Sequence, residues 1–260
     1  AAITPATRAL MPVHFAGLPL DMSALYALAR RHGLRVIEDA AHAIGSGPPG
    51  ARIGSAGDLV CFSFHPNKNM TTLEGGALVA DDPAELQLIE RQRFHGLQRH
   101  ADGTMDVTLP GGKCNLTDVA ARVGLGQLPL LDGFNDRRRH LAGLYFEQLR
   151  DEPRLRLPAR GDAGHSWHMF APLLDLPRLT ITRPQFIELM RQQDIGIGVH
   201  YPAIHTFSCY RQLGWKPGDC PNAERIGAQT VTLPLFPAMA DDDVARVCEA
   251  MRRILRENAQ

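Results

Sequence analysis

The sequence predicts an α/β fold whose first part holds a mostly parallel sheet and whose last part is a smaller α+β region. Short apolar runs alternate with helical patterns from residue 9 onward, and prolines and glycines become more frequent from about residue 152. The chain has 260 residues and is 44% hydrophobic, so it can bury a substantial core. We therefore expect a large domain over residues 1–150 and a small domain over residues 151–260.

The first three elements are predicted to be a strand, a helix and a second strand. Residues 9–15 form an apolar run, Asp21 can cap the helix that follows and Gly33 can end it, and residues 34–40 form the second strand. Such a unit with tight connections is typical of a parallel sheet, in which ligands bind beyond the carboxyl ends of the strands. Asp39 lies at one such end.

The later elements follow the same reasoning. Residues 58–64 and 75–81 are strand-like, and the polar segment between them carries Lys68. Helices are predicted over residues 83–95 and over 117–150, the second with an interruption at Pro129. After a linker marked by prolines and glycines, the small domain is predicted to contain strands at 169–175 and 197–201 and helices at 183–194 and 241–257.

Charge and cysteine content narrow the class of partner. Lysine plus arginine and aspartate plus glutamate number 28 each, so neither a nucleic-acid nor a membrane-binding charge pattern is present and a small-molecule partner is expected. Five scattered cysteines without a CxxC pair argue against a disulfide framework and predict a cytoplasmic location. His95 and His100 lack neighbours that would complete a metal site, so no metal is expected.

Lys68 and Asp39 are the residues with the most specific chemistry. A lysine in a loop is usually a solvated surface charge, but small and hydroxylated residues surround this one, which suits a close approach of backbone to a ligand. An amine and a carboxylate that face one pocket are what pyridoxal phosphate requires. The lysine forms a Schiff base, and the acid keeps the pyridine nitrogen protonated.

Several longer motifs carry a family resemblance. The stretches "VIEDAAHAIGS", "GDLVCFSFHPNKNMTTLEGGALVADD", "GGKCNLTDVAARVGLGQL" and "GIGVHYPAIH" follow one another in an order and spacing that resembles the DegT/DnrJ/StrS family of pyridoxal-phosphate-dependent sugar aminotransferases. The resemblance covers essentially the whole chain. It implies part of the large domain of a fold-type I transferase with a C-terminal α+β small domain, and transfer of an amino group from an amino acid, such as L-glutamate, to a nucleotide-linked keto-sugar.

The resemblance also implies roles for individual residues. Lys68 would bind the cofactor and carry the proton in catalysis, and Asp39 would hold the pyridine nitrogen. His42 would pack near the ring, Ser63 would contact the phosphate, and Asn115 would reach the phosphate of a neighbouring subunit, which implies a homodimer with shared sites. Residues expected on the substrate side are His65, His200 and Tyr201.

Each of these assignments has a plainer alternative. Asp39 could hydrogen-bond the turn that follows its strand, His42 could be a core histidine, and Ser63 could satisfy backbone groups only. Asn115 could instead cap the helix that begins near Thr117.

The sequence also departs from the family pattern. Family members usually carry a longer N-terminal part with a glycine-serine or glycine-threonine turn for the cofactor phosphate, and this sequence begins past it. Two hypotheses follow: an aminotransferase, or a non-catalytic remnant or partial chain that binds the cofactor weakly or with help from another polypeptide. Dehydratases of the family usually have histidine in place of the lysine, so Lys68 argues against that branch.

Overall fold

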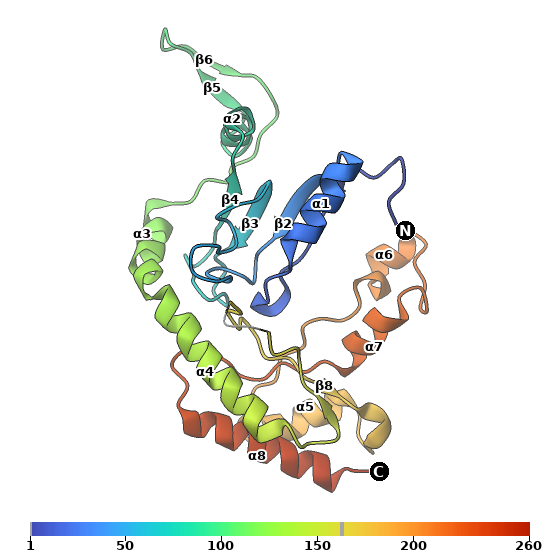
Figure 1. Cartoon of the computed structure of the whole chain (residues 1–260). Helices are drawn as coiled ribbons and strands as arrows, with labels where there is room; N and C mark the ends of the chain where they lie inside the picture. The colour runs from blue at the N-terminus through green and yellow to red at the C-terminus, as the bar shows by residue number, and fades with distance from the viewer. Residues whose placement is uncertain (1, 162–163) are drawn as a thin grey trace. The chain divides into compact units, whose positions relative to one another are not determined.

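The chain folds into two compact units. The computed structural model describes residues 2–161 and 164–260 (Figure 1). One unit comprises residues 1–133 and 163–166, and the other comprises residues 134–162 and 167–260. The residues 162 and 163 of the expected linker lie outside the described part. The predicted boundary between a large domain (residues 1–150) and a small domain (residues 151–260) stays a prediction.

A four-stranded sheet in the order β1, β2, β3, β4 lies in the first unit. β1 pairs with β2 and β2 pairs with β3 in parallel, whereas β4 pairs with β3 antiparallel, which confirms the mostly parallel α/β sheet. The strands are β1 (Ala9–Leu10), β2 (Arg35–Asp39), β3 (Leu59–Ser63) and β4 (Gly76–Ala80).

The strand predicted over residues 9–15 is shorter than expected. β1 ends at Leu10, and Pro12, which has no N–H to donate to a neighbouring strand, follows it. Val13 forms a single parallel bridge with Asp39. The N–H of His14 donates to Asp39 O at 3.0 Å and the N–H of Asp39 donates to Pro12 O at 2.9 Å, so the end of β2 keeps backbone partners after β1 has ended.

The helices of the first unit begin and end close to their predicted limits. The Asp21 side chain accepts the N–H of Ser23, and Gly33 closes the first helix in the left-handed conformation with a φ of 62°. Pro129 interrupts the later helical stretch, as predicted. The elements are η1 (Phe15–Gly17), α1 (Met22–His32), α2 (Pro83–Gln92), α3 (Asp118–Gln127) and η2 (Leu128–Leu130), with a hairpin of β5 (Leu97–Arg99) and β6 (Met105–Val107).

The second unit is α+β. It contains α4 (Leu131–Leu149, of which the first three residues count with the first unit), β7 (Leu155–Arg156), β8 (Leu173–Leu174), η3 (Leu176–Arg178), α5 (Arg183–Arg191), η4 (Ile204–Thr206), α6 (Ser208–Gln212), α7 (Pro221–Gln229) and α8 (Asp241–Glu257). The prediction of a strand over 197–201 is wrong. Only an isolated antiparallel bridge forms there, between Gly198 and Thr232, because Pro202 follows directly and cannot extend a ladder.

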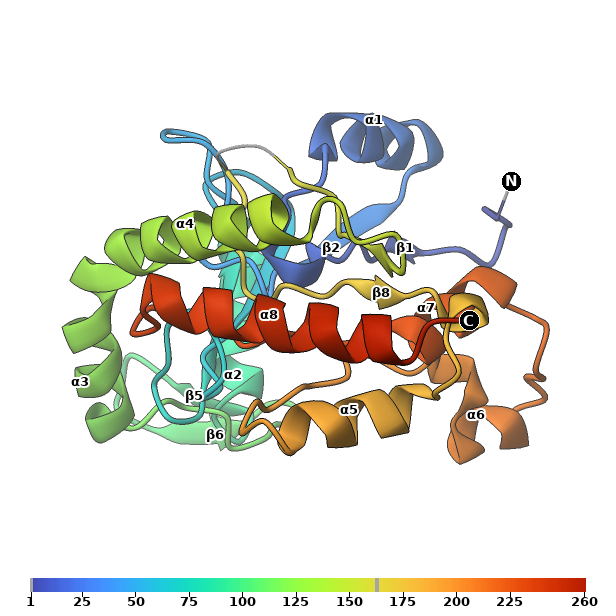
Figure 2. The same cartoon turned by 90° about the horizontal axis from the view of Figure 1, so that it is seen from below.

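Helices α4 and α8 lie side by side in the second unit (Figures 1 and 2). At one end Asp241 accepts from Arg137 and from His140, both at 2.8 Å, and at the other Arg252 donates to Gln148 O at 3.1 Å. The apolar stripe of α8 is buried between these ties, as its spacing predicts. Its buried residues are Val244, Val247, Cys248, Ala250, Met251, Ile254 and Leu255.

Within the described ranges, every helix is too short or too polar to cross a lipid bilayer.

Candidate active site

Asp39 lies at the carboxyl end of β2, which pairs in parallel with β1 and β3. Ligands of parallel sheets bind beyond such strand ends. Its Cα pairs with that of Cys61 on β3, and its Oδ1 accepts the N–H of Ala41 at 3.0 Å. The plainer role, support of the following turn, is therefore present. It uses Oδ1 and fixes the orientation of the carboxylate.

Lys68 lies in the segment between β3 and β4, and its backbone N–H donates to His65 O at 2.9 Å. The side chain is half-buried, and burial lowers the pKa of its amine below the ordinary value, while the charge of Asp39 opposes this shift. The same charge, together with burial, raises the pKa of the Cys61 thiol. The charge of Asp39 therefore acts on both the Lys68 amine and the Cys61 thiol. That Lys68 and Asp39 face one cofactor pocket stays a prediction.

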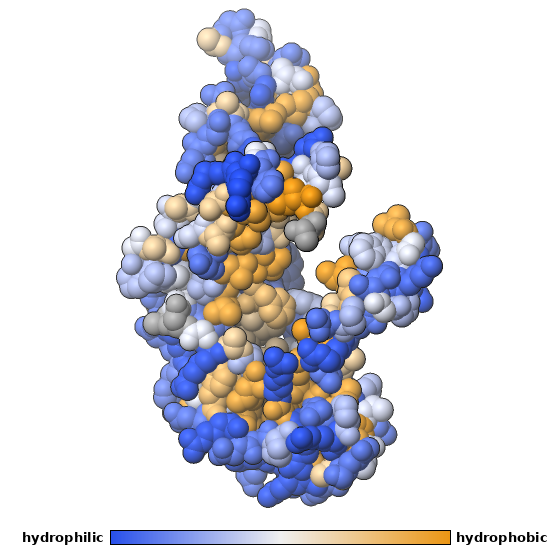
Figure 3. Space-filling model, turned by 45° about the vertical axis from the view of Figure 1, so that its right-hand side comes forward, coloured by the Kyte–Doolittle hydropathy of each residue, from blue (hydrophilic) through white to orange (hydrophobic). Residues whose placement is uncertain are grey.

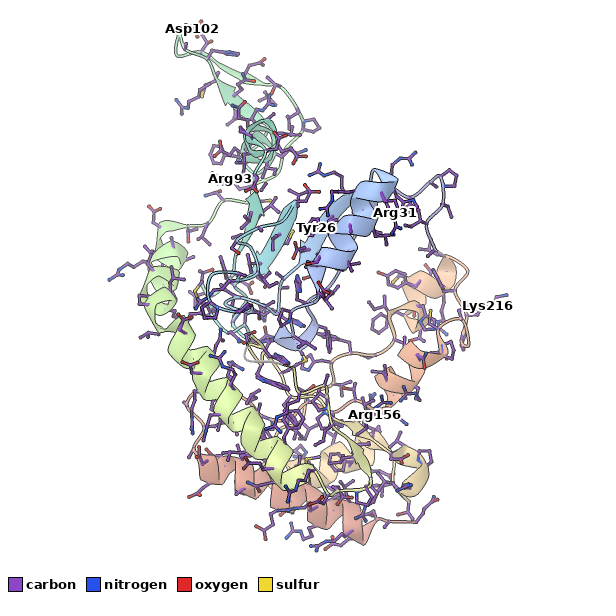
Figure 4. The ribbon with its side chains drawn as sticks, viewed as in Figure 1. Tyr26, Arg31, Arg93, Asp102, Arg156 and Lys216 are labelled. Carbon is purple, nitrogen blue, oxygen red and sulfur yellow. The ribbon has the colours of Figure 1, made fainter. Side chains whose placement is uncertain are left out.

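A buried polar network lies on the other face of β2. The side chains of Val36 and Glu38 are buried because strand residues alternate between faces, which places Glu38 opposite Asp39. His14 Nε2 contacts Glu38 Oε2 at 2.8 Å, and Tyr26 OH donates to Glu38 Oε1 at 2.6 Å. Figure 4 shows Tyr26 on α1. None of these three residues was predicted as a site residue, although a glutamate on the same face of the strand as Val36 was a visible signal.

The network fixes its own protonation pattern. The N–H of Leu20 donates to His14 Nδ1 at 3.1 Å, so the proton of a neutral His14 is on Nε2 and points at Glu38. Burial and the hydrogen bond to Glu38 raise the pKa of Tyr26 to about 12. A Cβ on Gly57 would lie 2.8 Å from Glu38 Oε1, so only glycine fits beside the network. These contacts hold β2 on the face opposite to Asp39.

His42 is buried, three residues after Asp39, and its ring lies beside the segment that precedes α1. The N–H of Ala16 donates to His42 Nδ1 at 3.3 Å, and the rings of Phe15 and His42 are 5.8 Å apart. Ala16 has a φ of 59°, which is unusual for a residue other than glycine and places its N–H against the histidine. The predicted role of His42 beside the cofactor ring stays a prediction.

Ser63 and His65 border the lysine segment. Ser63 ends β3, and its Oγ accepts the N–H of His65 at 3.3 Å. Ser63 therefore bonds a backbone group, as the plainer alternative predicts. His65 is exposed, with Nδ1 2.8 Å from Asn67 Oδ1 and Nε2 4.0 Å from the Glu74 carboxylate. Both predicted roles, phosphate contact for Ser63 and substrate contact for His65, stay predictions.

Asn115 lines a surface cavity of about 450 Å³ together with the glycine-rich start of β4 and the beginning of α3. The cap of α3 is Thr117, whose Oγ1 accepts the N–H of Ala120 at 3.2 Å. The alternative in which Asn115 caps this helix is therefore wrong. The predicted contact of Asn115 with a phosphate stays a prediction. Other residues that line the cavity are Thr72, Leu73, Glu74, Gly75 and Gly76.

His200 and Tyr201 belong to the second unit. His200 Nδ1 lies 2.9 Å from Thr232 Oγ1, and the two rings meet edge to face with centroids 4.8 Å apart. Tyr201 is exposed. Their predicted place on the substrate side of the site stays a prediction.

The comparison with known families agrees with this geometry. The sequence profile described as the DegT/DnrJ/EryC1/StrS aminotransferase family matches residues 1–252. The chain belongs to this family. Its aminotransferases depend on pyridoxal phosphate, which confirms the predicted cofactor, and its fold is that of fold-type I transferases.

Individual relatives agree with the family match. The chain is 40% identical to the spore coat polysaccharide biosynthesis protein SpsC of Bacillus subtilis, over 98% of this chain and 69% of that protein. The crystal structure of DesI with its TDP-sugar product is 30% identical with a TM-score of 0.85, over 98% of this chain and 64% of that one. A third relative is Spr1654 of Streptococcus pneumoniae, described as a putative sugar aminotransferase and solved in its pyridoxal phosphate form. It is 26% identical with a TM-score of 0.89, over 98% of this chain and 70% of that one.

The residues present fit pyridoxal phosphate in the chemistry of their donor groups. The cofactor requires an amine that can lose its proton, and burial lowers the pKa of the Lys68 amine in that direction. It also requires a fixed carboxylate, which the turn at Ala41 and the end of β2 supply at Asp39. These two residues would hold the reactive end and the ring nitrogen of the cofactor.

Proposed function

We propose that the protein catalyses pyridoxal-phosphate-dependent transfer of an amino group from an amino acid, L-glutamate, to a nucleotide-linked keto-sugar. The observation that carries this proposal is the half-buried amine of Lys68 under the electrostatic influence of Asp39, at the edge of a parallel sheet. The family match supports the same chemistry. Bound pyridoxal phosphate would supply an electron sink for the carbon that exchanges the amino group.

The chain's own residues would share the work. Lys68 Nζ would bind the cofactor and, once released by the donor amine, would move a proton at the reacting carbon. Asp39 would keep the proton on the ring nitrogen, and the bond from Ala41 to Asp39 Oδ1 holds the carboxylate in place for that purpose. His42 would pack against the ring, and Ala16 would orient its imidazole through Nδ1.

The proposed substrate class rests on the relatives. DesI was solved in the presence of its TDP-sugar product, and SpsC is described as a spore coat polysaccharide biosynthesis protein. We infer by analogy that the acceptor is a nucleotide-linked keto-sugar that is destined for an amino sugar of a surface polysaccharide, lipopolysaccharide or secondary metabolite.

We also propose a homodimer in which Asn115 of one subunit serves the cofactor phosphate of the other. The surface of the first unit supports this proposal, because α3 and η2 next to Asn115 expose large apolar side chains, which is typical of interaction surfaces. Figure 3 shows that apolar residues also gather in patches on another face of the molecule. The exposed residues near Asn115 are Leu116, Val119, Leu125, Leu128 and Leu130.

Substitution of Leu125 by aspartate is expected to break the dimer. Leu125 is 62% exposed on α3, so a charge there costs the folded subunit little but would be desolvated in an interface. The measurement is sedimentation velocity of wild type and of Leu125→Asp. A matched control is Leu213→Asp, at a residue that is 77% exposed in the second unit. Equal dimerisation of all three proteins would contradict the proposal.

The direct test of the function is a titration of the purified chain with pyridoxal phosphate, followed by L-glutamate. We expect a visible absorption band on addition of the cofactor, loss of this band on addition of glutamate, and release of one 2-oxoglutarate per site. A chain that stays colourless would favour the second hypothesis, a partial or non-catalytic chain. A band that forms and does not respond to glutamate would exclude glutamate as the donor.

A further inference from the structure

The segment that carries Lys68 is held mainly by bonds within itself. The backbone N–H of Thr72 donates to Phe64 O at 3.0 Å, and Thr71 Oγ1 donates to the same oxygen at 2.9 Å. Together with the turn from His65 O to the Lys68 N–H, these bonds close the segment into a compact loop. They fix the shape of the loop but do not attach it to other parts of the chain.

Two hydrogen bonds from the residues that follow Lys68 attach the loop to other parts of the first unit. The N–H of Thr71 donates to Gln127 Oε1 on α3 at 2.9 Å. Asn69, which directly follows Lys68, donates from Nδ2 to Ser166 O at 2.8 Å. Asn69 is 5% exposed, whereas Asn67, on the other side of the lysine, is exposed. A buried amide beside the lysine is costly unless it is bonded, so its bond fixes the position of the backbone at residue 68.

Ser166 is itself held firmly. Its N–H donates to Gly17 O at 3.1 Å, and its side chain lies 2.7 Å from Ser46 Oγ, which also donates to Gly17 O at 2.8 Å. Ser46 and Ser166 are fully buried. Gly164 O accepts the N–H of Gly47 at 2.8 Å, so residues 164–166 are attached at both of their ends. We call Gly17, Ser46 and Ser166 the serine hub.

The serine hub therefore connects two parts of the site. Gly17 ends the turn whose preceding residue, Ala16, donates to His42 Nδ1, and Ser166 accepts from Asn69 next to Lys68. All of these residues belong to the first unit. Because the hub is buried and its members are hydrogen-bonded to one another, it can anchor the lysine loop.

We propose that Asn69 is a positioning residue for Lys68, which acts by tying the lysine loop to the serine hub through Ser166 O. The loop is thereby kept in the position in which Lys68 is half-buried and its amine lies within the electrostatic influence of Asp39. This proposal rests on the proposed role of Lys68. Without the tie, the loop keeps its bond from Thr71 to Gln127 but loses the attachment next to the lysine, so residue 68 moves outward more easily and the amine gains water.

The test is the reactivity of the Lys68 amine in the cofactor-free protein. The chain has three lysines, Lys68, Lys113 and Lys216, so trace acetylation at increasing pH, read by peptide mass spectrometry, reports the pKa of each amine. Burial holds the pKa of Lys68 down in the wild type. Asn69→Leu keeps the number and branching of the side-chain heavy atoms and removes the donor, and we expect the Lys68 pKa to rise by roughly one unit, which is about a tenfold loss of free amine at neutral pH.

A matched control separates positioning from stability. Ser46→Ala removes buried hydrogen bonds from the same hub but leaves Asn69 and Ser166 O in place. It is expected to lower the melting temperature about as much as Asn69→Leu and to leave the Lys68 pKa unchanged. Exposed Lys216 is the internal standard in every protein. If Asn69→Leu does not fold, Asn69→Ala replaces it.

Two results would overturn the proposal: an unchanged Lys68 pKa in the Asn69 variant, or an equal rise in Ser46→Ala. The acetylation needs no cofactor, so it remains informative if the wild type fails to bind pyridoxal phosphate. That failure would count against the proposed function alone. Where the cofactor does bind, the Asn69 variant is expected to bind it about tenfold more weakly at neutral pH, because less of the amine is unprotonated.

Discussion

Lys68→Ala is expected to abolish the visible band with pyridoxal phosphate and to reduce aminotransfer on the order of 10³-fold or more, because the variant lacks both the amine that binds the cofactor and the base that moves the proton. Among the described residues the half-buried side chain of Lys68 makes no salt bridge, so its removal is expected to change stability little. The measurements are the absorption spectrum after cofactor addition, single-turnover release of 2-oxoglutarate, and the melting temperature.

The chain provides a close control for this variant. Lys216→Ala removes an exposed lysine in the second unit (Figure 4) and is expected to leave the spectrum and the rate as in wild type. Lys113 is less suitable, because its Nζ lies 4.0 Å from the centre of the Phe94 ring and its loss would change packing. A full visible band in Lys68→Ala would contradict the assignment and would direct attention to Lys113.

Asp39→Asn is expected to reduce aminotransfer roughly 10²- to 10⁴-fold, because an amide does not hold a proton on the ring nitrogen as a carboxylate does. The variant keeps an oxygen for the N–H of Ala41, so the turn after β2 is expected to persist. The visible band is expected to form still, because Lys68 is unchanged. Loss of rate with retention of the band would separate the role of the acid from that of the amine.

The same variant makes a prediction about pKa values whose sign follows from charge. The negative charge of Asp39 favours the protonated amine of Lys68, so its removal lowers the Lys68 pKa further below the ordinary value. It lowers the pKa of the Cys61 thiol as well, because that charge raises it in wild type. Trace acetylation measures the first value and the pH dependence of thiol alkylation the second.

Asp102→Asn is the control for the exchange of a carboxylate by an amide. Asp102 is exposed in the β5–β6 hairpin, where it accepts from Thr104 (Figure 4). We expect the rate and both pKa values to be as in wild type. If Asp39→Asn were as active as Asp102→Asn, or if the Lys68 pKa rose in it, the pairing of Asp39 with Lys68 would be wrong.

Local signals in the sequence predicted most of the helices and where three of the four strands of the main sheet lie in the chain. Asp21 and Gly33 delimit α1, and Pro129 separates α3 from α4, because caps and proline act through the backbone of neighbouring residues. The prediction of a strand over 197–201 is wrong because a strand depends on a distant partner and not on its neighbours in the sequence. A strand exists only where a partner ladder forms, and only Gly198 finds one, at Thr232.

The sequence by itself determined the chemistry of the site: a lysine within a segment of small and hydroxylated residues, an aspartate at the end of a strand, and motifs that identify the family. Only the tertiary structure decided how these groups are held. The network of His14, Tyr26 and Glu38 behind β2, and the bond from Asn69 to Ser166, join residues that are 12 to 97 positions apart in the chain. No local pattern encodes such contacts, because they arise only when the sheet and its loops have packed together.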